Sequence, residues 1–223
     1  MTLAPDAVRT MFDRIAPVYD PMNRVMTAGL DMRWRRLAAA AAVRPGDTVL
    51  DAACGTGDLA LAAAAAGAGE VVGVDFSPRM LERARRKSSA IEWVEGDLLA
   101  LPFPAASFDA ATIGFGIRNV PELERALAEL RRVLRPGGRL AVLEITRPRG
   151  LLRPFFTVWF DRIVPLLGRA LRAGAAYTYL PASVRRFPAA EELAALMTRA
   201  GFADVRFRLL GGSIVALHTG TAA

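Results

Sequence analysis

The chain has 223 residues, 53% of them hydrophobic, which suits a single α/β domain with a full core and argues against disorder. One cysteine, Cys54, excludes an internal disulfide, and one histidine, His218, argues against a zinc site. No uncharged apolar run approaches the roughly 20 residues of a membrane span, and the charged N-terminus has no signal-peptide pattern, so we expect a cytoplasmic protein.

The net charge is +7, from 29 basic and 22 acidic residues, and Lys87 is the only lysine. Heavy arginine usage is explained by a GC-rich genome or, alternatively, by a basic face for anionic lipid. Basic and aromatic residues do not interleave as on a base-stacking platform, and no nucleic-acid motif is present. We therefore expect no nucleic-acid partner.

Helical patterns occupy residues 5–42, with a connection expected at 23–29 and a helix over 30–43 that ends before a turn at 44–47. Strands and helices then alternate, which predicts a parallel sheet with right-handed crossovers. Ser77 followed by Pro78 is typical of a helix start. The expected strands are 48–53, 71–76, 91–95, 108–115 and 139–146, and the expected helices are 57–67, 78–88 and 121–134.

The most informative segment is VLDAACGTGD, residues 49–58, in which an apolar strand leads into a glycine turn and a helix. The next strand ends on Asp75, as in the first βαβ unit of a nucleoside-binding sheet. Asp51 and Asp58 bracket the turn, where they would repel a pyrophosphate but hold a sulfonium and an α-amino group. S-adenosylmethionine carries both groups, and Asp75 is placed to accept hydrogen bonds from its ribose hydroxyls.

Two other interpretations of the glycines stay open at this point. Gly55, Gly57 and Ala60 also satisfy the dinucleotide pattern, with Asp75 about 20 residues further on. That pattern would make the protein an NAD-dependent oxidoreductase, against which the two acids at the turn argue. Alternatively, the glycines only permit a tight turn between strand and helix.

The alternation breaks after the fifth strand. Residues 147–188 contain five prolines and an amphipathic stretch, 151–171, which we interpret as an insertion over the ligand crevice. A helix over 191–200 and a hairpin with strands 203–210 and 213–219 close the chain. The expected organisation is a single domain, with a helical cap (1–43), a cofactor-binding core (44–146), a lid insertion (147–188) and a closing helix and hairpin (189–223).

Four groups of residues carry a resemblance to a known family. They are MFDRIAPVYD at 11–20 with Asn23 and the Trp34-Arg35 pair, the glycine motif, GFGIRNV at 114–120, and the tail segments at 177–188 and 212–220. With them the chain resembles the class I S-adenosylmethionine-dependent methyltransferases, and more narrowly the C-methyltransferases of menaquinone and ubiquinone biosynthesis. The chain departs from the family pattern at Ser213 and in the basic stretch 168–175. These departures concern the shape of the substrate entrance more than the reaction.

The resemblance implies a Rossmann-like, seven-stranded sheet that is mostly parallel with an antiparallel last strand, plus N-terminal helices and a helical insertion. It implies methylation of a polyprenylated quinol ring carbon, with demethylmenaquinol or the ubiquinone-pathway benzoquinol as acceptor. Another lipid or a small molecule is the alternative acceptor. Removal of a quinol proton makes the ring carbon more nucleophilic, so the site needs a group that stabilises an oxyanion and no metal.

Arg118 and Asn119 follow the fourth strand, where ligands bind in such sheets, so Arg118 is our candidate for holding the oxyanion and Asn119 for donating to it. The structural alternative pairs Arg118 with Glu122 or Glu124 and makes Asn119 the cap of the helix beginning at Pro121. Tyr19 is the third catalytic candidate, closing over the methionine moiety, and packing is its alternative. Asp13 is a weaker candidate for a base.

The family pattern extends the cofactor site beyond the glycine turn. It places Asp97 at the adenine amino group and Leu98 against the ring, with an Asx-turn as the alternative role of Asp97. Cys54 and His218 are expected to be structural. The complete set of predicted cofactor residues is Asp51, Ala53, Gly55, Thr56, Gly57, Asp58, Asp75, Phe76, Asp97, Leu98 and Gly114.

A polyprenyl quinol partner gives a reason for the aromatic, arginine-flanked segment at 151–172. Such a helix can lie at a bilayer surface and admit a lipid, which would place the protein peripherally at the inner face of the membrane. The alternative is a lid that buries its aromatic side chains on the protein itself. The sequence leaves the oligomeric state, monomer or homodimer, open.

Overall fold

The computed structural model describes residues 5–149, 158–159, 162 and 174–223, and its centre is a seven-stranded sheet in the order β3-β2-β1-β4-β5-β7-β6. The first five strands are parallel, and β7 runs antiparallel to both β5 and β6, as the sequence predicts. The strands are β1 (Thr48–Ala52), β2 (Glu70–Asp75), β3 (Glu92–Glu95), β4 (Phe108–Gly114), β5 (Leu134–Ile145), β6 (Phe202–Leu210) and β7 (Val215–Ala222).

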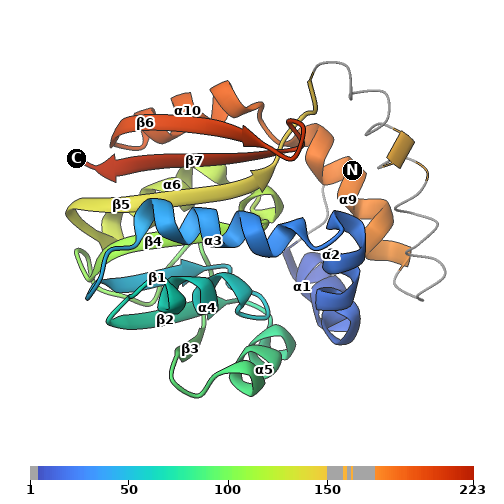
Figure 1. Cartoon of the computed structure of the whole chain (residues 1–223), viewed down its shortest axis with the longest axis horizontal. Helices are drawn as coiled ribbons and strands as arrows, with labels where there is room; N and C mark the ends of the chain where they lie inside the picture. The colour runs from blue at the N-terminus through green and yellow to red at the C-terminus, as the bar shows by residue number, and fades with distance from the viewer. Residues whose placement is uncertain (1–4, 150–157, 160–161, 163–173) are drawn as a thin grey trace.

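Helices cover both faces of the sheet and one of its edges (Figure 1). Helices α3 (Leu30–Ala42), α4 (Asp58–Ala65) and α5 (Pro78–Lys87) lie on one face, and α6 (Leu123–Val133) and α10 (Ala190–Arg199) on the other. Helices α1 (Pro5–Ile15), α2 (Tyr19–Thr27) and α9 (Gly174–Arg186) gather at the carboxyl ends of the parallel strands. Ligands bind at that edge in open α/β sheets.

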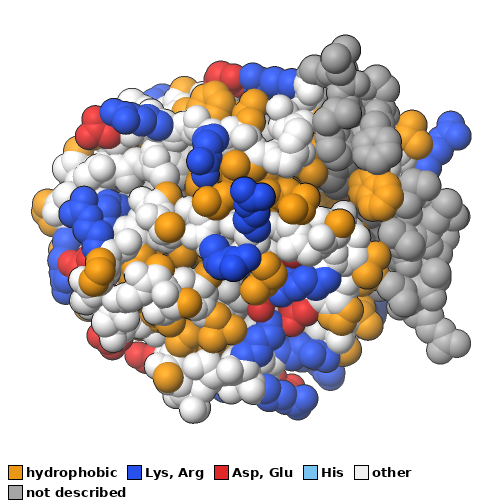
Figure 2. Space-filling view, in the orientation of Figure 1, with side chains coloured by type: hydrophobic (Ala, Val, Ile, Leu, Met, Phe, Trp, Pro, Cys, Tyr) orange, Lys and Arg blue, Asp and Glu red, His pale blue; other side chains and the backbone are white. Residues whose placement is uncertain are grey.

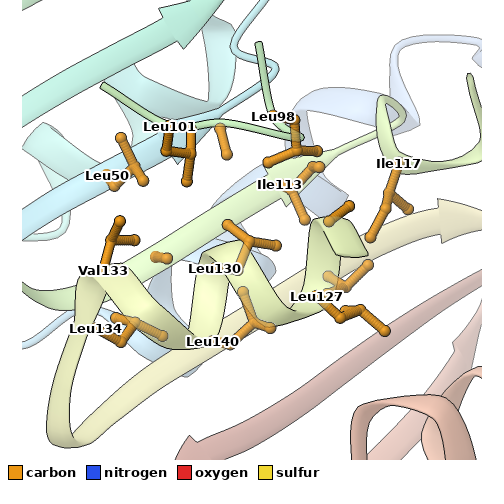
Figure 3. Close-up of a cluster of buried hydrophobic side chains, with 14 of the residues drawn as sticks. Leu50, Leu98, Leu101, Ile113, Ile117, Leu127, Leu130, Val133, Leu134 and Leu140 are labelled. Carbon is orange, nitrogen blue, oxygen red and sulfur yellow. The ribbon is translucent and has the colours of Figure 1, made fainter. Parts of the chain in front are cut away.

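Two hydrophobic cores, one on each face, hold the sheet between its helices. Figure 3 shows the α6 side, where Leu127, Leu130 and Val133 form one helical stripe and pack toward Ile113 and Leu140 of the sheet. On the other face the contacts of α3 and α4 are largely alanines, which lets the helices approach the sheet closely. A third cluster joins α1, α2 and α9, so the helical cap has its own core.

Local sequence signals explain several element boundaries. The Ser77 hydroxyl accepts the Met80 N–H at 3.2 Å at the start of α5, with Pro78 in the first helical position, as expected. The Leu134 end of β5 pairs with Phe108, and the four residues at 135–138 then loop out before pairing resumes at Arg139. The expected turn at these positions therefore lies inside β5 as a bulge.

The expected connection at 23–29 is wrong for most of its length. Helix α2 continues to Thr27, whose hydroxyl donates to the Asn23 carbonyl at 2.7 Å, and only Ala28 and Gly29 leave the helix, both with positive φ. Met22 of α2 is buried, and its burial stabilises a continued helix where the sequence pattern suggested a connection. Helix α6 begins at Leu123 rather than at Pro121. Among the described residues, no helix is long and apolar enough to cross a membrane.

The amphipathic stretch predicted at 151–171 lies largely outside the described residues, which include only 158–159 and 162 of it. The C-terminal part of the predicted insertion is α9, which contains Pro181 within the helix. Leu180 and Val184 of α9 pack into the same cluster as Met11 and Met22. The N-terminal cap and α9 thus form one layer at the carboxyl edge of the sheet.

Candidate active site

The glycine turn between β1 and α4 owes its shape to left-handed backbone conformations. Ala53, Gly55 and Gly57 have φ values of 49°, 56° and 85°. Glycine adopts such positive φ values without steric cost, which explains the residue type at positions 55 and 57. A Cβ atom on Gly57 would lie 2.5 Å from Cη2 of the Trp93 ring, so no larger residue fits there. The Gly55 N–H donates to Asp75 Oδ2 at 2.7 Å, which ties the turn to the end of β2.

A cavity of about 120 Å³ opens beside this turn, at the carboxyl ends of β1, β2 and β4. We call it the cofactor cavity. Phe12 and Tyr19 of the helical cap cover it, with their rings edge to face at 6.3 Å between centroids. The predicted cofactor residues that line it are Ala53, Gly55, Thr56, Asp58, Asp75, Phe76, Asp97, Leu98 and Gly114.

Asp51 and Gly57 are the two predicted residues that do not line the cofactor cavity. The contact of Asp51 with the ligand therefore stays a prediction. Its carboxylate is buried beneath the turn, where Oδ1 accepts the Thr112 hydroxyl at 2.8 Å and Oδ2 has no partner among the described residues. Burial raises the pKa of Asp51 to about 7.

Asp75 occupies the place that the sequence predicts for a ribose contact. Its Oδ1 accepts the Ser77 N–H at 2.9 Å, and its Oδ2 accepts the Gly55 N–H. Each carboxylate oxygen has a second lone pair, so the side chain still has acceptor capacity toward the cavity that it lines. Burial raises the pKa of Asp75 to about 6, and the two backbone donors oppose that rise.

Asp58 lines the cavity within a network of charges that motif reasoning missed. Its carboxylate contacts Arg24 of α2 at 2.7 Å and Lys87 of α5 at 2.6 Å. Burial favours a higher pKa for Asp58, but these two cations outweigh it and lower the pKa. Lys87 also pairs with Asp20 at 2.6 Å, and Asp20 accepts the Thr56 hydroxyl at 2.6 Å. The network fastens α2 to the glycine turn.

Asp97 and Leu98 lie at the far end of the cofactor cavity, after β3. Asp97 Oδ1 accepts the Leu99 N–H at 2.9 Å, so the alternative Asx-turn role is present in the structure. That role uses one oxygen of a carboxylate that also lines the cavity, so the turn and a ligand contact are compatible. Phe76 and Leu98 supply apolar surface that suits a purine ring.

A second, larger cavity of about 460 Å³ adjoins the first, and we call it the acceptor cavity. Five residues line both cavities, namely Phe12, Tyr19, Arg35, Phe115 and Asn119. The rest of the lining is mainly apolar and comes from α1, α2, α3, the end of β5, α9, the β6–β7 turn and Trp159. The helical cap, the sheet edge and α9 thus enclose an apolar chamber that meets the cofactor cavity at a shared wall.

Arg118 lines the acceptor cavity, and Glu144 at the end of β5 fixes its position. Arg118 Nη1 donates to Glu144 Oε1 at 2.8 Å and to the Phe115 carbonyl, and the pair is buried, with side-chain exposures of 9% and 1%. The Arg118 Nε atom is buried without a partner among the described residues. The alternative pairing with Glu122 or Glu124 is wrong. Glu144 escaped the motif analysis, although an acid inside the apolar run AVLEI was its signal.

Asn119 lies in a short 3₁₀ turn, Ile117–Asn119, between β4 and α6. The alternative role as a helix cap is wrong, because Glu122 occupies the N-cap position of α6. Instead the Asn119 side chain reaches both cavities, and its Oδ1 is buried with no partner in the part of the chain that the structure describes. An unpartnered buried acceptor beside an apolar cavity is suited to a polar ligand group.

Three residues discussed from the sequence lie outside the shared wall. Asp13 Oδ1 accepts the Ser77 hydroxyl at 2.7 Å and the Arg79 N–H at 3.4 Å, which supports the start of α5 and not a role as a base. His218 is buried in β7, with Nε2 2.8 Å from the Ala190 carbonyl, and burial lowers its pKa. Cys54 is buried in the turn, where burial raises the thiol pKa well above its usual range.

Residues 1–222 match the model of the ubiE/COQ5 methyltransferase family. The chain is 49% identical over 218 residues to the demethylmenaquinone methyltransferase of Thermus thermophilus, covering 94% of this chain and 99% of that protein. It is 47% identical over 210 residues to the 2-phytyl-1,4-naphtoquinone methyltransferase of Synechococcus elongatus, covering 90% of each. The chain belongs to the ubiE/COQ5 methyltransferase family. It is therefore an S-adenosylmethionine-dependent C-methyltransferase.

Solved structures show the same fold at lower sequence identity. A methyltransferase of Thermotoga maritima, described as a possible histamine N-methyltransferase, aligns with a TM-score of 0.67 and 24% identity over 96% of this chain and 99% of that one. The [4+2]-cyclase SpnF aligns with a TM-score of 0.70 and 20% identity over 96% and 94%. A shared fold therefore says nothing here about the acceptor, which depends on the site.

The cofactor cavity fits S-adenosylmethionine, the cofactor of the family. Asp75 lines it with acceptor capacity left over, as expected for a ribose contact, and Phe76 and Leu98 line it with apolar surface, as expected for an adenine contact. The close approach of Gly116 to Ala53, where an added Cβ would lie 2.7 Å from the Ala53 Cβ, leaves no room for a larger side chain at the wall. When bound, the cofactor supplies an electrophilic methyl group.

Proposed function

We propose that this enzyme methylates a ring carbon of demethylmenaquinol, a polyprenylated naphthoquinol. The observation that carries the proposal is the apolar acceptor cavity that adjoins the cofactor cavity and is lined by Arg118 and Asn119. Each of these residues has one buried polar atom without a partner among the described residues, Arg118 Nε and Asn119 Oδ1. The names of the relatives from Thermus thermophilus and Synechococcus elongatus favour a naphthoquinol over a benzoquinol ring.

The two unpartnered atoms are complementary to the two states of a quinol oxygen. Asn119 Oδ1 is an acceptor, so we propose that it receives a hydrogen bond from a quinol hydroxyl, whereas the sequence led us to expect a donor. Arg118 Nε–H is a charged donor, and it stabilises the oxyanion that forms when the quinol loses a proton. A phenolate is the more nucleophilic form of the ring, so this stabilisation promotes carbon methylation.

Glu144 acts as a positioning residue in this proposal. Its carboxylate accepts from the Arg118 backbone N–H at 3.2 Å as well as from the guanidinium, so it fixes both the main chain and the side chain. Tyr19 and Phe115 line both cavities and would exclude water from the space between acceptor and cofactor. Exclusion of water from this wall strengthens the charge interaction of Arg118.

The mouth of the acceptor cavity has the features of a membrane contact. The exposed large hydrophobic side chains among the described residues are Val25, Leu30 and Val158. Leu30 lines the cavity, and the other two are neighbours of lining residues Met26 and Trp159. We propose that this rim contacts the inner face of the cytoplasmic membrane, from which a polyprenyl quinol can enter without crossing water.

On the face that Figure 2 draws, positive charge is not concentrated at one patch. Figure 2 shows Lys and Arg side chains at several separate places on one face, between hydrophobic groups. We therefore expect apolar contact at the rim to matter more for vesicle binding than charge does. The test is sedimentation with vesicles of neutral and anionic lipid, comparing the native protein with a Val25→Asp/Leu30→Asp variant.

An assay with S-adenosylmethionine and two reduced acceptors tests the proposed function. A short-chain demethylmenaquinol and a demethylated benzoquinol are compared, and methyl incorporation is followed by mass spectrometry. We expect a higher kcat/KM for the naphthoquinol. Exclusive transfer to the benzoquinol would overturn the choice of ring. No transfer to either, with cofactor binding intact by calorimetry, would indicate another lipid or small molecule as the acceptor.

A further inference from the structure

Arg35 of α3 is a buried cation that the sequence analysis assigns to no chemistry. The residue is 5% exposed, and its Nε has no hydrogen-bond partner among the described residues. Its nearest carboxylate contact is Asp31 Oδ2, 3.8 Å from Nε, beyond hydrogen-bond distance. A buried guanidinium with a free donor costs stability, so its retention calls for a ligand or a partner.

The Arg35 guanidinium lies in the wall of the cofactor cavity, close to Gly114 and Phe115. A Cβ on Gly114 would lie 3.4 Å from Arg35 Nη1, so the guanidinium lies against the end of β4. Its Cζ atom is 5.1 Å from the centroid of the Phe115 ring, which keeps the side chain at the wall between the two cavities. Electrostatic interaction with Arg35 also lowers the pKa of Asp58, which lines the same cavity.

Among the described residues that line the cofactor cavity, Arg35 is the only Lys or Arg. The acids that line it are Asp58, Asp75 and Asp97, which the sequence analysis assigns to the amino group, the ribose and the adenine of the cofactor. S-adenosylmethionine also carries one α-carboxylate, which needs a cation when it leaves water. Arg35 is the cation on this wall, and its ion pair with Asp31 at 3.8 Å leaves its N–H donors without a hydrogen bond to a carboxylate.

We propose that Arg35, whose counter-charge in the fold is Asp31 at 3.8 Å, also binds the α-carboxylate of the cofactor and so selects for an intact methionine moiety. The planar guanidinium is suited to a carboxylate because two parallel N–H groups reach its two oxygens. The inference rests on the cofactor and not on the quinol, so its failure leaves the proposed acceptor untouched.

The test measures binding, by calorimetry, of S-adenosylmethionine and of decarboxylated S-adenosylmethionine, which keeps the amino group and lacks only the carboxylate. We expect the native protein to bind the intact cofactor about 10- to 100-fold more tightly, as a charge-assisted pair supports. In Arg35→Met the preference falls to about one because affinity for the intact cofactor is lost selectively. Equal affinities in the native protein would overturn the proposal without any variant.

Arg24→Met is the matched control. Arg24 also neutralises Asp31 and Asp58, but it lines neither cavity, so we expect its loss to weaken both ligands in similar proportion. If Arg35→Met behaves like Arg24→Met, Arg35 is a structural counterion and the proposal fails. If Arg35→Met leaves both cofactor affinities unchanged and raises only the acceptor KM, Arg35 serves the acceptor cavity and the proposal also fails.

Discussion

The two cavities that share a wall are built in different ways. The cofactor cavity takes most of its lining from short segments that follow β1, β2, β3 and β4, and its walls carry three carboxylates. The acceptor cavity takes its lining from α1, α2, α3, α9, the end of β5 and the β6–β7 turn, and it is largely apolar. The comparison teaches that local motifs create the polar half of the site, and the packing of distant segments creates the apolar half.

Loss of Arg118 should produce the largest effect. In Arg118→Met, we expect turnover to fall about 100- to 1,000-fold, as for removal of an oxyanion donor. We also expect the free energy of unfolding to fall by about 3–5 kcal/mol, because Glu144 is left buried and unpaired. Steady-state kinetics and urea denaturation measure the two effects, and S-adenosylhomocysteine should still bind the folded variant.

The double variant Arg118→Met/Glu144→Gln separates catalysis from folding. It removes the unpaired charge, so stability should recover in large part and turnover should not. Recovery of turnover in the double variant would mean that Arg118 serves only the fold, and the polar wall of the acceptor cavity would then need another catalytic group.

Asp75→Asn should act on the cofactor half alone. We expect affinity for S-adenosylhomocysteine to fall about 10- to 100-fold, because an amide is a weaker acceptor for ribose hydroxyls than a carboxylate. Asp109→Asn is the control, since Asp109 also accepts a backbone N–H, from Thr48 at 3.0 Å, and lines neither cavity. Unchanged affinity in Asp75→Asn by calorimetry would remove the ribose assignment.

Cofactor affinity should depend on pH through Asp75. Its folded pKa of about 6 lies above the unfolded value, so this group's contribution to the free energy of unfolding falls as pH rises from about 4 to about 6. Ligand binding requires the ionised form, so affinity should change in the opposite sense and decline as pH falls from 7 to 5. Calorimetry across this range, with Asp75→Asn showing a flatter profile, checks the sign.

A substitution in the apolar half should have the smallest effect. Met26 of α2 lines only the acceptor cavity, and in Met26→Trp we expect the KM for a short-chain acceptor to rise by about tenfold through lost volume. Glu82 of α5 is exposed and lines neither cavity, so Glu82→Trp is the control and should leave KM unchanged. An equal loss of cofactor affinity in Met26→Trp would show that the two cavities are not separable.

The difference between the two cavities also decides which site residues could be predicted from the sequence. Gly55 and Asp75 were predictable because their contact joins residues 20 positions apart within one βαβ unit whose spacing is fixed. The pairing of Glu144 with Arg118 was not predictable, because the two residues lie 26 positions apart on different elements and no local spacing links them. The network at Asp58 depends on how α2 and α5 pack over the turn, which is a tertiary property.

Errors in the sequence predictions have similar physical causes. Turn-forming residues near Asn23 suggested a connection, but burial of Met22 extends the helix to Thr27. The turn expected at 135–138 was placed before the fifth strand, but pairing of Leu134 with Phe108 puts these residues inside β5. The alternation of strands and helices predicted a parallel sheet, and this prediction was confirmed for the first five strands.

The single lysine gives the protein a natural reporter group. Lys87 is the only lysine in the sequence, its side chain is 26% exposed, and it bridges Asp20 of α2 and Asp58 at the turn. Apart from the α-amino terminus, an amine-selective label therefore reacts only at Lys87. The Lys87 amine is held in ion pairs with Asp20 and Asp58 as long as α2 stays packed on the glycine turn. The labelling rate at that one atom, followed by mass spectrometry, would time the opening of the cap without any engineered probe.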